Sequence, residues 1–163
     1  MKYAIITGAS SGFGAATAKE LQNMGYGLVL LARRMERLVS LKEELTATPI
    51  YIAQLDVCQE DEVKEVIKQL PNEIADNIYI LVNNAGYGLV GEFESYSFEE
   101  TQKMMQVNMN ALVETCYRFY PMLSGKGQAY VLNIASSTAY QAIPLMSVYA
   151  ASKVFVLNFS RGL

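Results

Sequence analysis

Five short apolar runs recur along the chain, and each is followed by a segment whose apolar residues have helical spacing. The runs do not alternate apolar with polar residues, which is typical of strands buried on both faces. The predicted strands are Tyr3–Thr7, Leu28–Ala32, Ile50–Leu55, Ile78–Val82 and Ala129–Ile134. This alternation predicts an α/β fold, a doubly wound, Rossmann-like parallel sheet with helices on both faces.

The segments between the runs predict five helical regions. Three are compact: Gly12–Met24, Met35–Leu45 and a helix that follows Asp56 and ends at Pro71. Ser97-Phe98-Glu99-Glu100 is a capping box that opens a long region to about Leu123, which we expect to be bent or divided near its middle. A last helix begins near Ser147.

Length and composition limit the possible organisation and partners. The chain has 163 residues and no internal repeat or linker, so we expect one domain over residues 1–163. A net charge of −3 without a basic stripe gives no case for nucleic-acid binding. No apolar run approaches the roughly 20 residues of a membrane helix. With no signal peptide, cytoplasm is the expected location.

Composition also limits the chemistry, because the chain contains no histidine. This excludes Ser-His-Asp and Cys-His hydrolases and histidine-ligated zinc sites. Cys58 and Cys116 lie far apart and are expected to be free thiols, and two cysteines cannot make a Cys₄ metal site. We therefore expect no metal, and any acid–base group must be a Tyr, Lys, Asp, Glu or Ser.

A glycine-rich loop follows the first strand and leads into a helix. Strand, tight loop and helix N-terminus together suit a pyrophosphate, because free backbone N–H groups and the helix dipole both favour an anion. The spacing G-x-x-x-G-x-G differs from the commoner G-x-G-x-x-G, and an ordinary glycine-rich turn is the alternative. The candidate cofactor-binding residues here are Gly8, Ser10, Ser11, Gly12, Phe13 and Gly14.

Polar or small residues also follow the next three strands, where a doubly wound sheet binds its ligands. Arg33 suits the 2′-phosphate of NADP, whereas an acidic residue there would suit NAD; two solvated arginines are the alternative. Asp56 can accept a hydrogen bond from an adenine amino group, or simply open a helix. Val57, directly after Asp56, is a further candidate. The remaining candidates, which leave room for a flat ligand or form a plain turn, are Asn84, Ala85 and Gly86.

Tyr149 and Lys153 lie four residues apart, on one face of the last predicted helix. A neighbouring cation favours the phenolate form of a tyrosine, which a general acid–base requires in a protein without histidine. Ser136 follows the fifth strand, thirteen residues before Tyr149. Because Tyr–Lys pairs at this spacing are common on ordinary helices, the pair is only a candidate when taken alone.

Together these residues resemble the short-chain dehydrogenase/reductase family, in the family's order and over nearly the whole chain. The glycine spacing is closer to the family's compact branch, most of whose members interconvert carbonyls and alcohols. The matching elements are Thr7-Gly8-x-x-x-Gly12-x-Gly14, Asp56-Val57, Asn83-Asn84-Ala85-Gly86, Val107-Asn108, Ser136 and Tyr149-x-x-x-Lys153.

The resemblance implies hydride transfer between a nicotinamide, with NADP(H) favoured over NAD(H), and a small-molecule carbonyl or alcohol. Tyr149 would donate or remove the proton, and Ser136 would orient the substrate oxygen. Lys153 would favour the phenolate and bind the nicotinamide ribose. Asn108 would hold a water that links Lys153 to solvent. The apolar segments Tyr87–Phe93 and Tyr140–Met146 favour a moderately hydrophobic substrate.

Members of the family continue beyond the point that corresponds to Leu163, so the resemblance implies a missing substrate-covering segment and a sheet incomplete at its C-terminal edge. In relatives, the helices that carry Asn108 and Tyr149 commonly pack across a dimer interface, which implies a homo-oligomer. The alternative function is a catalytically incompetent fragment that binds nucleotide or serves as an association module.

Overall fold

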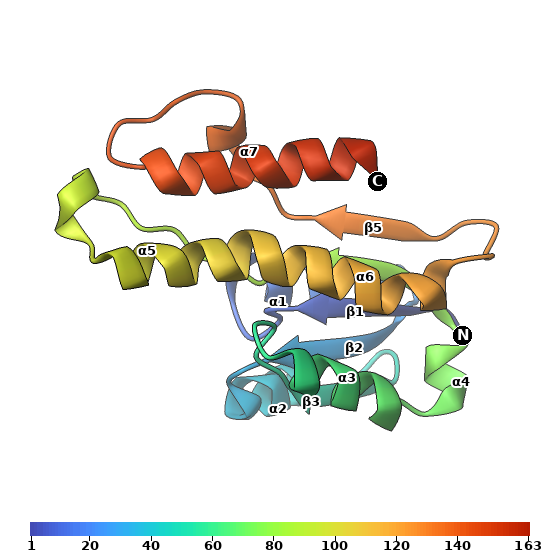
Figure 1. Ribbon diagram of the computed structural model, residues 1–163. Coiled ribbons are helices and arrows are strands. Elements are labelled where there is room, and N and C mark those ends of the chain that lie inside the picture. The colour runs from blue at the N-terminus through green and yellow to red at the C-terminus, as the bar shows by residue number, and fades with distance from the viewer.

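The computed structural model describes residues 1–163 and is built around a five-stranded sheet (Figure 1). The strand order is β3-β2-β1-β4-β5, and every neighbouring pair is parallel. This order confirms the predicted doubly wound sheet, with the change of direction between β1 and β4. The strands are β1 (Tyr3–Thr7), β2 (Gly27–Ala32), β3 (Ile50–Gln54), β4 (Ile78–Asn83) and β5 (Tyr130–Asn133).

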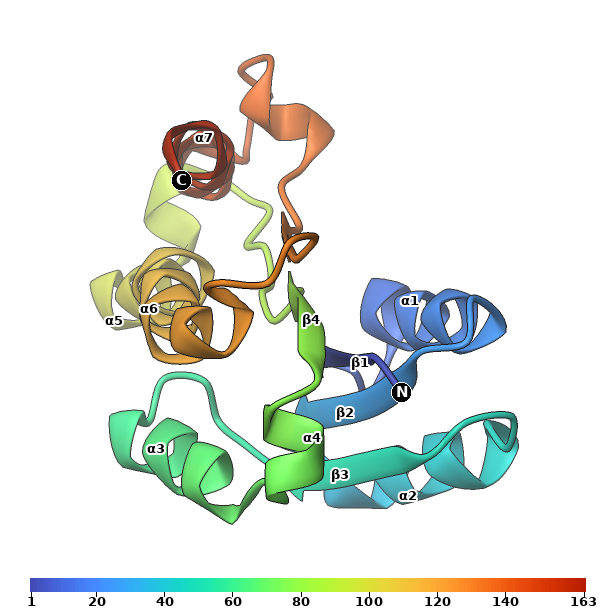
Figure 2. The same ribbon diagram turned by 90° about the vertical axis from the view of Figure 1, so that its right-hand side faces the viewer.

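Helices cover both faces of the sheet (Figure 2). Side chains alternate along a strand, so Ala4 and Ile6 of β1 pack against one helical layer, whereas Tyr3 and Ile5 pack against the other. The first layer is α1 (Gly12–Asn23) and α2 (Met35–Glu44). The second layer contains α3 (Glu60–Gln69), α6 (Ala111–Leu123) and α7 (Ser147–Gly162). A short helix that was not predicted, α4 (Asn72–Ala75), precedes β4.

The long helical region before β5 is divided, as expected, by a π-helical turn. It consists of α5 (Phe98–Met105), the π turn Gln106–Asn110 and α6. The capping box is confirmed at the start of α5, where the Ser97 hydroxyl accepts from the Glu100 N–H (3.2 Å) and the Glu100 carboxylate accepts from the Ser97 N–H (2.9 Å). The π turn buries the side chain of Asn108.

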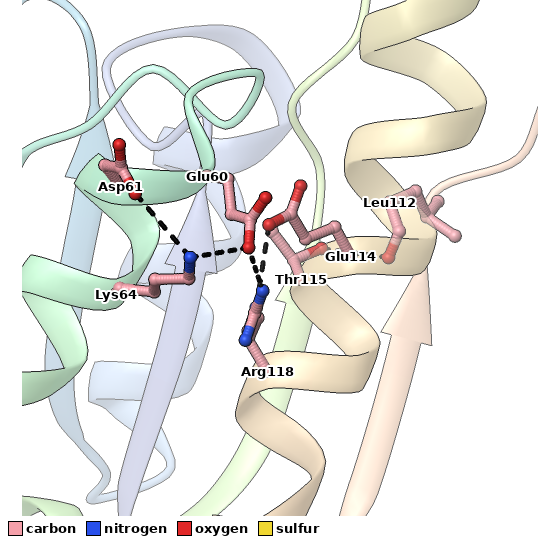
Figure 3. Close-up of polar contacts among 7 residues, drawn as sticks. All are labelled: Glu60, Asp61, Lys64, Leu112, Glu114, Thr115 and Arg118. Atoms are coloured by element: carbon pink, nitrogen blue, oxygen red, sulfur yellow. Dashed lines mark hydrogen bonds and ion pairs between the residues drawn. The ribbon is translucent and has the colours of Figure 1, made fainter.

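A cluster of charged side chains joins α3 to α6 on the outer surface of the second layer (Figure 3). Lys64 Nζ lies 2.6 Å from a Glu60 carboxylate oxygen and 3.6 Å from an Asp61 oxygen. Glu60 also pairs with Arg118 of α6, whose Nε lies 3.6 Å from Glu114. The pairs that Lys64 makes with Glu60 and Asp61 are exposed, and exposed ion pairs stabilise little individually, whereas the buried apolar residues of α3 and α6 pack in one core cluster.

The strand β5 forms one edge of the sheet, as predicted, and is one residue shorter at each end than the apolar run that indicates it. Its Tyr130 and Leu132 side chains are 57% and 47% exposed. None of the helices combines the length and the apolar character needed to cross a membrane.

Candidate active site

A cavity of about 680 Å³ opens at the carboxyl ends of the strands, beside the change of direction between β1 and β4. Gly12, Gly14 and Asn108 are the predicted site residues that do not line it. The predicted residues that do line it are Gly8, Ser10, Ser11, Phe13, Arg33, Asp56, Val57, Asn84, Ala85, Gly86, Ser136, Tyr149 and Lys153.

The loop after β1 requires glycine for two different reasons. Gly8 and Gly12 have φ values of +64° and +55°, which L side chains rarely adopt. Gly14 is required by space, since a Cβ there would lie 2.5 Å from both the Gly8 carbonyl oxygen and Asn84 Nδ2. No side chain caps the N-terminus of α1, so its first N–H groups face the loop without a side-chain partner.

Thr7 and Asn84 hold the loop after β1 against the loop after β4. The Thr7 hydroxyl accepts from the N–H groups of Asn84 (3.1 Å) and Ala85 (3.2 Å). In return, Asn84 Nδ2 donates to the carbonyl oxygens of Thr7 (3.1 Å) and Gly8 (3.0 Å). The Asn84 side chain therefore shapes the glycine loop, while Ala85 beside it lines the cavity.

Two arginines lie at the start of α2, at the same end of the cavity as the glycine loop. Arg34 Nη2 donates to the hydroxyls of Ser10 (3.1 Å) and Ser11 (2.8 Å). Arg33 lines the cavity as well, and neither arginine has an acidic ion-pair partner. Because no carboxylate neutralises either guanidinium, both positive charges can attract a bound anion. Arg33 is the predicted phosphate ligand, and Arg34 is an additional candidate that the doubled arginine in the sequence indicates.

Asp56 lies at the end of β3 and holds the turn into α3. Its Oδ1 accepts from the Cys58 N–H (3.0 Å), and its own N–H donates to the Glu62 carboxylate (2.7 Å). Asp56 therefore shapes the start of the helix and lines the cavity as well. Burial and the nearby Asp56 carboxylate raise the pKa of Cys58 to about 11.

Tyr149 and Lys153 lie on the first turns of α7 and line the cavity together with Ser136. Lys153 Nζ donates to the carbonyl oxygen of Ile134 (2.8 Å) and lies 5.9 Å from the centre of the Tyr149 ring. Burial lowers the pKa of Lys153. The Ser136 hydroxyl accepts from the Thr138 N–H (3.2 Å), which leaves its own proton free to donate.

Asn108 lies beneath the cavity and clamps the loop after β4. Its Oδ1 accepts from the Tyr87 N–H (3.1 Å), and its Nδ2 donates to the Tyr87 carbonyl (2.9 Å). The same Nδ2 donates to the Ser152 hydroxyl (3.1 Å) on α7. A Cβ at Gly86 would lie 2.9 Å from Asn108 Oδ1, so this position needs glycine.

Several cavity residues were not predicted as site residues. Tyr87, which the sequence indicates only as part of the apolar segment Tyr87–Phe93, is the largest of them, and its backbone is held by Asn108. The others are Ala32, Arg34, Leu55, Val107, Ile134, Ala135 and Ser137. Each of them lies one or two residues from a predicted position, so the sequence indicates the right strand ends but not every side chain.

The geometry places an end with two arginines and the glycine loop and an end with Tyr149, Lys153 and Ser136 in one cavity. At the first end, glycine loop, serine hydroxyls and arginines suit phosphate groups. At the second end, a phenol, an ammonium group and a hydroxyl suit proton transfer to an oxygen. A ligand that spans the cavity would therefore present its phosphates and its reacting group to different strand ends of the same sheet.

Comparison with known proteins identifies the family of the chain. A model of the short chain dehydrogenase family matches residues 2–163. A sulfoacetaldehyde reductase of Chromohalobacter salexigens is 37% identical over 161 residues, covering 97% of this chain and 63% of that protein. An NADP-dependent 3-hydroxy acid dehydrogenase of Escherichia coli is 36% identical over 160 residues, covering 98% of this chain and 64% of that protein.

A solved structure has the same fold. The closed form of serine dehydrogenase complexed with NADP⁺ superimposes with a TM-score of 0.92 at 34% identity, covering 98% of this chain and 64% of that one. The chain thus spans a little under two thirds of the length of these relatives. The chain belongs to the short chain dehydrogenase family, whose matched relatives are named as reductases and dehydrogenases.

Proposed function

We propose that residues 1–163 form a dinucleotide-binding domain of an NADP(H)-dependent oxidoreductase that interconverts a carbonyl and an alcohol. The observation that supports this function is the single cavity that joins Arg34 and the glycine loop to Tyr149 and Lys153. NADP(H), when bound, supplies or accepts the hydride. The relatives named as NADP-dependent or complexed with NADP⁺ support the same cofactor for this chain.

The residues at the end with the arginines and the glycine loop fit this cofactor. Gly8 brings the backbone to the cavity without a side chain, Gly12 allows the left-handed turn before α1, and the uncapped N-terminus of α1 offers N–H groups to a pyrophosphate. Arg33, Arg34 and the hydroxyls of Ser10 and Ser11 would hold the 2′-phosphate, because a guanidinium makes strong charge-assisted hydrogen bonds with phosphate oxygens.

The residues at the other end would manage the proton and the substrate oxygen. In this proposal Tyr149 donates a proton to a carbonyl oxygen, or removes one from an alcohol. The Ser136 hydroxyl donates to the same oxygen and orients it. Lys153, whose Nζ already donates to the Ile134 carbonyl, keeps a positive charge near the phenol and has further protons for a ribose hydroxyl.

Asn108 is proposed to support a water that connects Lys153 to solvent. The support for this role is its position in the π turn, beneath Gly86 and beside the residue that precedes Lys153. The side-chain amide makes three hydrogen bonds to Tyr87 and Ser152, and its Oδ1 accepts only one of them, which leaves this oxygen a second lone pair for the water.

The substrate is proposed to be a small aldehyde, ketone or alcohol, since the relatives are named for sulfoacetaldehyde, 3-hydroxy acids and serine. We also propose a homo-oligomer that packs through α5–α6 and α7. The apolar surface on these helices supports it, because Tyr117 is 75% exposed and Phe155 is 39% exposed. Size-exclusion chromatography that finds only a monomer would contradict this packing.

Tyr149→Phe is the central test of the proposed function. We expect turnover on a panel of aldehydes and ketones to fall by about 10²–10⁴-fold, the usual contribution of general acid–base catalysis. The dissociation constant for NADPH, measured by its fluorescence, should stay the same. A variant that keeps near-native turnover would remove Tyr149 from the mechanism, and NADPH binding without turnover of any substrate would contradict the catalytic proposal.

A further inference from the structure

Gly88 lies directly against the ring of Tyr149, in the loop that follows β4. A Cβ built on Gly88 would lie 3.1 Å from Tyr149 Cδ2, 3.2 Å from Cε2 and 3.3 Å from Cγ. Contacts this short are tighter than ordinary van der Waals contact. We infer that Gly88 is a positioning residue that sets the orientation of the Tyr149 ring, an inference that rests on the proposed role of Tyr149.

The backbone of Gly88 does not itself require glycine. Its φ lies outside the left-handed region, in contrast to Gly8, Gly12, Gly25 and Gly125. The atoms nearest to its missing side chain all belong to the Tyr149 ring. A larger residue is therefore opposed by the ring rather than by backbone strain.

The loop cannot easily move away from the ring. Asn108 holds the residue before Gly88 by both the N–H and the carbonyl of Tyr87. Three residues after Gly88, the Gly91 N–H donates to the Leu145 carbonyl (2.8 Å) in the segment before α7. The loop is thus fixed on both sides of the contact.

The backbone of Tyr149 is fixed as well. Its carbonyl accepts from the Ser152 hydroxyl (2.7 Å), and Ser152 in turn accepts from Asn108. Lys153, one turn further along α7, is anchored to the Ile134 carbonyl. With both backbones held, a methyl group at Gly88 would have to displace the ring by side-chain rotation. Rotation of the ring about its own long axis leaves Cγ, 3.3 Å from the added Cβ, in place, so the contact is relieved by rotation about χ1, which carries the hydroxyl at the far end of the ring with it.

A displaced hydroxyl should lower turnover without weakening cofactor binding. Misplacement of a reacting group by about 1 Å can cost about 100-fold in rate, so a shift of about half an ångström at the hydroxyl should cost about tenfold in kcat. Gly88 does not line the cavity assigned to the cofactor, so the dissociation constant for NADPH should be unchanged. Gly88→Val should be more harmful than Gly88→Ala.

The first test reads the ring directly and needs no substrate. In protein labelled with 3-fluorotyrosine, the ¹⁹F resonance missing from Tyr149→Phe identifies Tyr149. Gly88→Ala should shift or broaden this resonance, whereas Gly127→Ala, where nothing lies within 4 Å of the added Cβ, should not. Gly91→Ala is a matched control in the same loop, because its Cβ would lie 3.1 Å from the ring of Tyr96.

An unchanged Tyr149 resonance in Gly88→Ala, or an equal shift in all three glycine variants, would overturn the inference.

The second test is a double-mutant comparison of turnover. If Gly88 acts through Tyr149, Gly88→Ala should lower kcat about tenfold in the native background and have no further effect in Tyr149→Phe. Equal losses in both backgrounds would show that Gly88 acts elsewhere. Near-native turnover of Tyr149→Phe alone would contradict the proposed function, while the ¹⁹F result would still decide the contact.

Discussion

Replacement of Arg34 should separate the affinities for NADPH and NADH. The guanidinium of Arg34 donates to Ser10 and Ser11, at the end of the cavity assigned to the 2′-phosphate. In Arg34→Ala this end loses a cation whose hydrogen bonds to a phosphate would be charge-assisted. NADH has no 2′-phosphate, so its binding should not depend on this side chain.

The magnitude follows from the hydrogen bonds that are exchanged. Hydrogen bonds to charged groups contribute about 1.5–3 kcal/mol, and each 1.4 kcal/mol is a factor of ten in affinity. Because Arg34 is exposed and already bonded to two neutral hydroxyls, the net effect belongs in the lower part of this range. We expect the dissociation constant for NADPH to rise by about 10- to 50-fold, and that for NADH to change by less than about twofold.

Fluorescence titration of both cofactors measures this difference directly. The matched control is Arg37→Ala, which removes an equal charge from the first turn of α2 at a position that does not line the cavity. Arg33→Asp is the complementary variant, and we expect it to shift the preference toward NADH, because a carboxylate can accept from the ribose hydroxyl. The reasoning is refuted if both cofactors weaken together in Arg34→Ala, or if Arg37→Ala has the same effect.

Three further predictions concern buried groups. Burial lowers the pKa of Lys153, so the charged lysine destabilises the folded state at pH 7. This destabilisation is lost as the pH rises toward 10.5, because the folded state releases the proton at a lower pH than the unfolded state does. Urea unfolding at several pH values should therefore show the wild type gaining stability relative to Lys153→Met over this rise. Gly14→Ala places a Cβ 2.5 Å from Asn84 Nδ2 and should destabilise the fold by about 1–3 kcal/mol, and an unchanged melting temperature would contradict the crowding. Burial raises the pKa of both Cys58 and Cys116 to about 11, so a thiol reagent should modify the folded protein slowly at pH 7.5 and faster only as the pH rises toward 11; rapid labelling at neutral pH would disagree with their burial.

Local patterns were enough to predict the sheet. The strand β1 has the predicted bounds, Tyr3–Thr7, because the apolar run ends there at Gly8, whose positive φ begins a turn. The ends of the strands then named most of the cavity, since a parallel sheet brings its carboxyl ends to one edge. The assignment of Tyr149 and Lys153 to one helix face also follows from spacing alone.

Contacts between distant segments could not be predicted in this way. Asn108 reaches Tyr87 and Ser152, which lie 21 and 44 residues away in the sequence, and nothing in the composition around it indicates these partners. The same holds for Arg34 and the two serine hydroxyls, which meet only because α2 starts beside the loop after β1. Gly88 is an ordinary loop glycine until the ring of Tyr149 is placed beside it.

The π turn at Gln106–Asn110 gives the chain one residue more than an uninterrupted α-helix would need over the same length. Deleting a residue there would rotate α5 by about 100° about its axis relative to α6, since an α-helix has 3.6 residues per turn. Met104, which is 1% exposed, would then turn out of the core while Phe119 stayed in place. The helical spacing of hydrophobic residues before Asn108 is therefore offset by one residue from the spacing after it. A designed variant must keep the additional residue so that α5 and α6 both turn their apolar faces to the core.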